Sequence, residues 1–136
     1  MFKRIDHVEV ITDQPERTVE FYTDVLGFKV KSRDRIEHSG AGVPINLVYL
    51  ELEGSTVELI TYEDTKVEPA PTGIHLGYNL IALEVEDMQK AIQFLKTKGV
   101  EVVWGPKMRE KHSARAEIAD PNGNRIELRQ WFSATV

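Results

Sequence analysis

The sequence contains two successive copies of one pattern, and this internal duplication strongly limits the folds that the chain can adopt. In each copy an alternating apolar stretch is followed by an amphipathic helical stretch, a glycine and further alternating stretches. A shift of 73 positions places residues 7–10 (HVEV) on 80–83 (LIAL). A shift of 69 positions places 56–59 (TVEL) on 125–128 (RIEL). The shared order of elements predicts two equivalent β-α-β-β-β units.

Apolar periodicity and turn residues predict where the elements of each copy lie. The first copy is expected to contain strands at 5–11, from 28, at 45–52 and at 55–62, with a helix that begins near Asp13 and Pro15 and ends at Gly27. The second copy is expected to contain strands at 79–86, 100–103, 113–119 and 124–131, with a helix capped by Asp87 that runs to about Lys98. The tetrapeptide Asp120-Pro121-Asn122-Gly123 predicts a hairpin turn between the last two strands.

These elements predict an α+β fold in which the two modules form a cupped, eight-stranded mixed sheet with the helices outside. The first module spans 1–62 and the second spans 79–136, within one domain of 136 residues. The stretch 63–78 is polar at its start and contains two prolines, which indicates a linker. The concave face of such a sheet is the natural place for a small-molecule ligand.

Charge and composition exclude several classes of function. Lys and Arg number 17 against 22 Asp and Glu, for a net charge of −5, which argues against nucleic acid or an anionic membrane as a partner. The chain contains no cysteine, so thiolate metal sites, disulfides and cysteine nucleophiles are excluded. No apolar run approaches the length of a membrane span, and the first residues do not resemble a signal peptide. We therefore expect a cytoplasmic protein.

Strand alternation predicts which side chains enter the cup. In the first strand Val8 and Val10 should face the helix, so His7 and Glu9 face the concavity. By the same argument Glu58 and Glu127, which lie between apolar neighbours at matching positions of the two copies, also face the cup. An imidazole and two carboxylates from three strands suit a divalent ion such as Zn, Ni, Co, Mn or Fe(II). Against this, single histidines and glutamates on strands are more often simply exposed residues.

Other side chains are candidates for contacts with a ligand. We expect these substrate-binding residues to include Asn46, Tyr49, Tyr62, Leu80, His112 and Arg115. His112 and Arg115 have the charge to bind a substrate anion, although a solvated position at the rim is the commoner role for such residues. Trp104 and Trp131 are assigned to packing rather than to ligand stacking. The sequence contains no phosphate-binding loop, no nucleophile elbow and no dinucleotide-binding fingerprint.

Two segments resemble one family closely. Residues 18–28 (TVEFYTDVLGF) match the first helix of the vicinal oxygen chelate superfamily, and 120–128 (DPNGNRIEL) match its last hairpin. That superfamily includes glyoxalase I, methylmalonyl-CoA epimerase, extradiol dioxygenases, fosfomycin-resistance enzymes and bleomycin-binding proteins. The resemblance covers nearly the whole chain and is specific for the fold, and much less specific for the reaction.

The resemblance to glyoxalase I implies metal ligands at His7, Glu58, Glu127 and the start of the fifth strand, with Glu58 or Glu127 also acting as the catalytic base. At the fourth position this chain has Leu80, which cannot bind a metal, and His75 lies five residues earlier. One hypothesis is therefore a metal-dependent lyase or isomerase that acts on a small α-oxygenated carbonyl compound. The alternative is a metal-free binding protein of the bleomycin-resistance type. An Fe(II) oxygenase would need a second histidine where Leu80 stands. The family also implies a homodimer.

Overall fold

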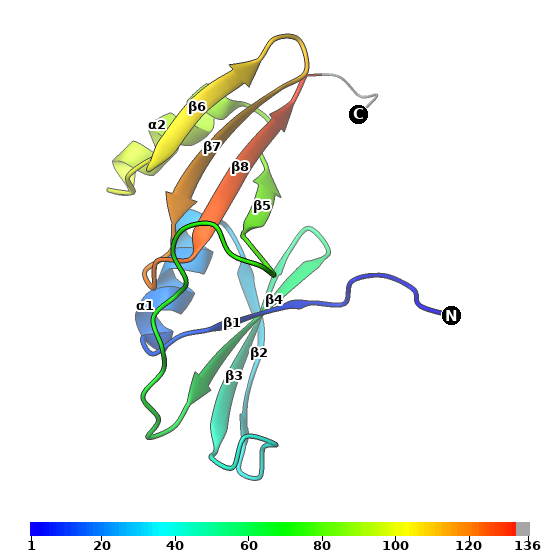
Figure 1. Cartoon of the computed structure of the whole chain (residues 1–136), viewed down its shortest axis with the longest axis vertical. Helices are drawn as coiled ribbons and strands as arrows, with labels where there is room; N and C mark the ends of the chain where they lie inside the picture. The colour runs from blue at the N-terminus through cyan, green and yellow to red at the C-terminus, as the bar shows by residue number, and fades with distance from the viewer. Residues whose placement is uncertain (133–136) are drawn as a thin grey trace. The chain divides into compact units, whose positions relative to one another are not determined.

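The computed structural model describes residues 1–132 and divides the chain into two compact units, Met1–Pro69 and Ala70–Val136 (Figure 1). The boundary between the units falls within the stretch 63–78, which the sequence assigns to a linker. Each unit contains one four-stranded sheet and its own helical segment.

The first unit contains a four-stranded mixed sheet with the strand order β1-β4-β3-β2. Strand β1 pairs in parallel with β4, whereas β4 with β3 and β3 with β2 are antiparallel. Its elements in chain order are β1 (Val8–Ile11), α1 (Pro15–Glu20), the π-helical turn η1 (Phe21–Val25), β2 (Lys29–Ile36), β3 (Ile45–Leu52) and β4 (Ser55–Tyr62).

The second unit repeats this topology, with the strand order β5-β8-β7-β6 and a parallel pair between β5 and β8. Its elements are β5 (Ile81–Glu84), α2 (Met88–Thr97), β6 (Trp104–Arg109), β7 (Ser113–Ala119) and β8 (Arg125–Trp131). Helix α2 lies on one side of this sheet (Figure 1), and Gln130 of β8 accepts a hydrogen bond from Met88 N at its start, at 2.8 Å. The α+β class and the two β-α-β-β-β modules expected from the duplication are therefore confirmed.

The strand register makes the two units equivalent residue by residue. In the first unit Glu9 lies opposite Glu58 across β1 and β4. In the second unit Ala82 lies opposite Glu127 across β5 and β8. Glu58 and Glu127 therefore occupy the same position in their units, as the sequence comparison predicts, and Ala82 is the counterpart of Glu9.

Turn chemistry explains why the hairpins form where the sequence predicts them. Strands β3 and β4 have the expected bounds, 45–52 and 55–62, because Glu53 and Gly54 both adopt positive φ angles, 46° and 84°, in the two-residue turn. In the turn between β7 and β8, Oδ1 of Asp120 accepts hydrogen bonds from the backbone N–H groups of Asn122 and Asn124, both at 2.9 Å. This side chain fixes the loop before β8 begins at Arg125.

Helix starts follow the expected capping chemistry in one unit and differ in the other. Asp87 caps α2 by accepting a hydrogen bond from Lys90 N at 3.0 Å, as predicted. Helix α1 begins at Pro15 with Gln14, rather than Asp13, at the cap position, and it continues into η1 rather than as one α-helix. Within residues 1–132, none of the helices has the length and hydropathy that a membrane span requires.

The core of each unit lies between its sheet and its helix. Tyr22, Leu50 and Leu59 are almost fully buried in the first unit, and Ile118 and Ile126 in the second. Because side chains alternate along a strand, the residues between these apolar positions lie on the opposite face of each sheet. Glu58 and Glu127 are on that opposite face.

One predicted strand is wrong. The segment 100–103 contains three valines and was expected to be a strand, but pairing begins only at Trp104, the first residue of β6. Val100 N instead bonds to Leu95 O and completes the end of the helix at 2.9 Å, which removes this residue from the sheet. A register shift between Trp104 and Lys107 then separates the paired parts of β6. Helix termination and this irregularity override the β-propensity of valine.

We predict that Gly105→Ala destabilises the protein by about 2 kcal/mol more than Gly123→Ala. Both glycines have positive φ angles, 81° and 84°, so both alanines suffer the same backbone strain. A methyl group at Gly105 would also lie 2.8 Å from Arg115 O and 3.1 Å from Ala116 Cα, whereas Gly123 has open space. Urea unfolding of the two variants measures the difference, and equal losses would show that β6 and β7 can separate freely.

Candidate functional site

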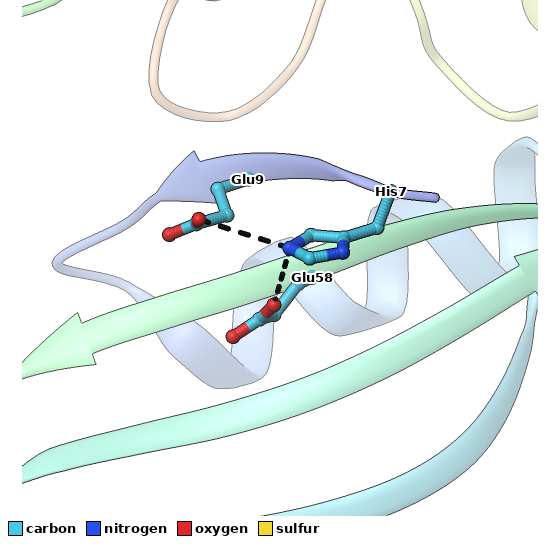
Figure 2. A group of neighbouring side chains, drawn as sticks. All are labelled: His7, Glu9 and Glu58. Atoms are coloured by element: carbon cyan, nitrogen blue, oxygen red, sulfur yellow. Dashed lines mark ion pairs between the residues drawn. The ribbon is translucent and has the colours of Figure 1, made fainter. Parts of the chain in front are cut away.

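Three metal-competent side chains gather on the open face of the first unit. His7 immediately precedes β1, Glu9 lies two residues later on the same face, and Glu58 reaches them from β4 (Figure 2). His7 Nε2 lies 3.0 Å from Glu58 Oε2 and 3.7 Å from Glu9 Oε2. The parallel pairing of β1 with β4 thus joins residues that lie about fifty positions apart in the chain.

A third carboxylate, that of Asp6, orients the histidine. Asp6 Oδ2 lies 2.9 Å from His7 Nδ1, and an ionised carboxylate can only accept a hydrogen bond. The pKa of Asp6 is lowered chiefly by this hydrogen bond, so Asp6 is ionised and Nδ1 carries the donated proton. In the neutral imidazole Nε2 then has no proton, and its lone pair points toward Glu58 and Glu9.

Burial and charge shift the acid–base properties of the cluster. The pKa of His7 is raised, mainly by the hydrogen bond to Asp6 and further by the negative charge of Glu58. The pKa of Glu58 is also raised, because this carboxylate is buried, although His7 and Tyr49 oppose the shift. Glu9, by contrast, is more than half exposed. Burial thus makes Glu58 hold a proton more readily than a solvent-exposed glutamate does.

The separations between these atoms fit a divalent metal ion. Ligand atoms at about 2.0–2.2 Å from a tetrahedral zinc lie roughly 3.3–3.6 Å apart. The ligand atoms of His7, Glu9 and Glu58 all lie within 4.8 Å of one another, and the two distances to His7 Nε2 bracket the tetrahedral separation. The hydrogen bond from Nδ1 to Asp6 is the outer-shell arrangement that metal-ligating histidines commonly use. The residues of the first unit therefore fit the metal that the family resemblance implies.

An open cavity of about 480 Å³ adjoins the cluster on the same face. Glu9, Glu58, Tyr49 and Tyr62 contribute to its wall, together with apolar residues of β2, β3 and β4. Tyr49 lies directly opposite Glu58, and burial beside this carboxylate raises the pKa of the phenol. Of the predicted substrate-binding residues, Tyr49 and Tyr62 thus lie with His7 and Glu58. Asn46 lies on the other face of β3, where its amide donates to Glu63 at 2.8 Å.

The second unit has a different constellation at the equivalent face. Glu127 is buried, and its two carboxylate oxygens lie 3.1 Å from Arg115 Nη2 and 3.0 Å from Arg129 Nη2. Leu80, the counterpart of His7, is half-buried just before β5. His112 contacts the edge of the Trp131 ring and pairs with the Ser113 hydroxyl.

Equivalent positions on the two faces carry opposite chemistry. The first unit has Leu47 opposite Ile60, and both line its cavity. At the same register positions the second unit has Arg115 opposite Arg129. The two faces thus have the same backbone arrangement and a glutamate at the same position. The face of the first unit is apolar with metal-competent donors, whereas the face of the second unit carries several cations.

Sequence reasoning placed Glu9 on the open face but left it out of the metal set. Its position two residues after His7 on one strand was the available signal. Arg129 and Glu117 were not predicted at all, although each lies two residues along a strand from a predicted site residue, Glu127 and Arg115 respectively. The two tryptophans, which the sequence assigns to packing, each lie against an arginine of the second unit, and Trp104 is exposed.

The duplicated fold and its open, ligand-sized face define a class of protein built from paired β-α-β-β-β units. The chain belongs to the Glyoxalase/Bleomycin resistance protein/Dioxygenase superfamily, whose family model matches residues 4–128. This confirms the family resemblance on which the expectations for the site depend.

Comparison with individual proteins agrees with this assignment. Lactoylglutathione lyase GLX1 of Arabidopsis thaliana is 26% identical over 130 residues, which cover 94% of this chain and 44% of the plant protein. The chain therefore spans less than half the length of that relative. A glyoxalase family protein from Bacillus cereus has the same fold, with a TM-score of 0.83, 20% identity and coverage of 98% and 97% of the two chains. TnmS3, an antibiotic binding protein from a Streptomyces species, has a TM-score of 0.71 at 21% identity, with 96% and 97% covered.

We predict that Asp6→Asn lowers the pKa of His7 in the metal-free protein. The hydrogen bond to Asp6 is the largest cause of the raised pKa, and asparagine keeps an acceptor there without the negative charge. A pH titration of the histidine ring signals by NMR measures the change, and His7→Ala identifies the His7 signal among the four histidines. Asp13→Asn is the control and should leave this pKa unchanged. An unaltered titration in Asp6→Asn would contradict the orientation assigned to the ring.

Proposed function

We propose that the protein is a metal-dependent lyase or isomerase of the glyoxalase I type, which acts on a small α-oxygenated carbonyl compound. The divalent ion is held in the first unit by His7, Glu9 and Glu58, with Zn, Ni, Co, Mn and Fe as the candidate ions. The family resemblance also supports a homodimer as part of this proposal, and the cytoplasmic location stays an expectation from the sequence.

The charge of the cluster is the observation that carries the proposal. Asp6, Glu9 and Glu58 surround one imidazole, and Asp6 already takes the Nδ1 proton. With neutral His7, the Nε2 lone pair would lie 3.0 Å from a carboxylate oxygen, which is repulsive. A cation between Nε2 and the two glutamates relieves this repulsion, whether it is a proton or a metal ion. The separations between His7 Nε2 and the two carboxylate oxygens are close to those between metal ligands. A divalent ion can therefore interact with all three groups at once.

Glu58 is the residue best suited to move a proton in this site. A bound divalent ion supplies Lewis acidity, which polarises a carbonyl oxygen and acidifies the neighbouring C–H group. Glu58 is buried and faces the adjoining cavity, so its carboxylate is placed to take a proton from a substrate bound there. The adjoining cavity, with Tyr49 opposite Glu58, offers a place for the substrate.

Glu127, which the resemblance implies as a further ligand and possible base, has a different environment. Both of its oxygens are within ion-pairing distance of arginines, and two guanidinium groups repel an additional divalent cation. Because Leu80 and Ala82 offer no donor atoms either, we assign metal binding in this proposal to the first unit alone.

We predict that His7→Ala lowers the affinity for Zn²⁺ by more than about 100-fold, because loss of even an outer-shell partner lowers metal affinity by about 10–100-fold. Isothermal titration of the metal-free protein with Zn²⁺, repeated with Mn²⁺, measures the affinity. His75→Ala, which changes an exposed histidine elsewhere in the chain, is the matched control and should bind as the wild type does.

The same titration shows whether Glu127 takes part in metal binding. Glu127→Gln should leave the affinity for Zn²⁺ unchanged if His7, Glu9 and Glu58 hold the ion. A large loss in Glu127→Gln would instead make Glu127 a ligand, and a loss in His75→Ala would move the site toward that histidine. If the wild type takes up no divalent ion, the enzymatic proposal fails.

We predict that the metal-loaded protein accelerates hydrogen exchange at the carbons next to the carbonyl of hydroxyacetone, a minimal α-oxygenated carbonyl compound. Exchange into D₂O is followed by NMR, in parallel with lactoylglutathione, the compound in the name of the plant relative. Glu58→Gln should reduce the accelerated rate by about 10²–10⁴-fold, the usual contribution of a general base. Glu51→Gln, a change on the neighbouring strand β3, is the control. Equal rates in the two variants would remove Glu58 from the chemistry.

A metal-free binding protein is the second candidate, and the second unit is the observation that favours it. Its open face has no donor at Leu80 or Ala82, and its glutamate is paired with arginines. The fold also occurs in TnmS3, an antibiotic binding protein. A protein that takes up no divalent ion, yet binds small organic molecules in the cavity of the first unit, would establish this candidate instead.

A further inference from the structure

The open face of the second unit carries a row of cations that metal binding in the first unit does not explain. Strand register places Lys107 opposite Arg115, and Arg115 opposite Arg129, across β6, β7 and β8. Residues directly opposite each other point to the same face of the sheet. Like charges in such positions repel each other, so a row of three needs anions close by.

The row is incompletely neutralised by the carboxylates beside it. Glu117 and Glu127 lie opposite each other in the next row, and three arginines share them. Glu117 lies 2.8 Å from Arg125 Nε and 3.3 Å from Arg115 Nη2. Glu127 lies 3.1 Å from Arg115 Nη2 and 3.0 Å from Arg129 Nη2. Glu84 lies opposite Arg129 at the β5 end of the row, and among residues 1–132 it forms no ion pair.

Two tryptophans hold the guanidinium groups in place. Arg115 Cζ lies 4.7 Å from the centroid of the Trp104 ring, and Arg129 Cζ lies 4.7 Å from that of Trp131. Stacking on an aromatic ring fixes the plane of a guanidinium group and lowers the entropy that it loses when it binds an anion. The cationic face is therefore preorganised by residues of the second unit alone.

Both arginines retain hydrogen-bond donors without acceptors. Their Nε atoms are buried without a partner among the described residues. Within residues 1–132 their Nη1 groups also form no hydrogen bond. Because guanidinium groups bind carboxylate or phosphate through their N–H donors, and because the two side chains are 40% and 23% exposed, the unused Nη1 donors have the chemistry of an anion site.

We propose that Arg115 and Arg129, framed by Trp104 and Trp131, form a binding site for the carboxylate or phosphate group of a small anionic ligand. Glu127 acts there as an internal anion, which pairs with the arginines and competes with the ligand for them. This site goes beyond the function proposed above, and it does not depend on metal binding by the first unit.

The site can be tested on the full-length, metal-free protein because the chain contains only two tryptophans and both stack on these arginines. Titration with inorganic phosphate, and separately with succinate, should change the tryptophan emission saturably at low ionic strength. Added NaCl should weaken the binding, as expected for a partly exposed ion pair. The two anions distinguish a phosphate site from a carboxylate site, and calorimetry provides the same affinities without the tryptophan signal.

Variants distinguish a specific arginine site from general attraction of anions to positive charge. Arg129→Gln should weaken binding of the preferred anion by about tenfold or more, because it removes charged hydrogen-bond donors. Arg129→Lys, which keeps the charge without the planar fork, should recover only part of this loss. Glu127→Gln should strengthen binding by about threefold, because it removes the competing carboxylate. Arg33→Gln, on β2 of the first unit, is the charge-matched control and should have no effect.

Several results would overturn the site. Absence of saturable binding of both anions to the wild type at low salt would exclude it. Equal affinities in Arg129→Gln and Arg33→Gln would show diffuse attraction to positive charge. Weaker anion binding by a Glu127→Gln protein whose circular dichroism and thermal unfolding match the wild type would remove Glu127 as a competitor. If Glu127→Gln does not fold, the comparison of Arg129→Lys with Arg129→Gln decides.

Discussion

The parallel pairing of the first strand of each unit with its last strand is the interaction on which both open faces depend. It inserts β1 beside β4, so that residues at opposite ends of the unit become neighbours in the sheet. His7 and Glu9 reach Glu58 only through this pairing, and Ala82 meets Glu127 by the same register in the second unit. Antiparallel hairpins alone would leave these side chains apart, because they connect only strands that follow each other in the chain.

Much of this arrangement could be predicted because the duplication can be read from one sequence. Alternation placed His7, Glu9 and Glu58 on one face, and the turn residues fixed the bounds of β3 and β4. The valines at 100–103 led to an incorrect strand prediction. Their strand propensity competes with the end of the preceding helix, and the backbone hydrogen bond from Val100 N to Leu95 O favours the helix end. Local sequence contains no information about such a competition.

The environment of Glu127 could not be predicted in the same way. Alternation placed Glu127 on the open face, yet its contacts with Arg115 and Arg129 depend on the register of β7 against β8. A slip of one residue would send every one of these side chains to the other face. The family resemblance also favoured a metal ligand at this glutamate. A family pattern identifies the glutamate itself, but it does not include the neighbouring arginines that pair with its carboxylate.

The equivalence of Glu9 and Ala82 has a consequence for how such a protein can change over evolutionary time. Hydrogen bonds between strands come from the backbone, so substitutions on an open face leave the ladder and the core behind it intact. A duplicated gene segment therefore provides a second scaffold on which selection can act separately. At three equivalent positions one repeat has a glutamate and two apolar residues (Glu9, Leu47 and Ile60), and the other has an alanine and two arginines (Ala82, Arg115 and Arg129). Acquisition of a new recognition surface need not begin with the loss of an old one.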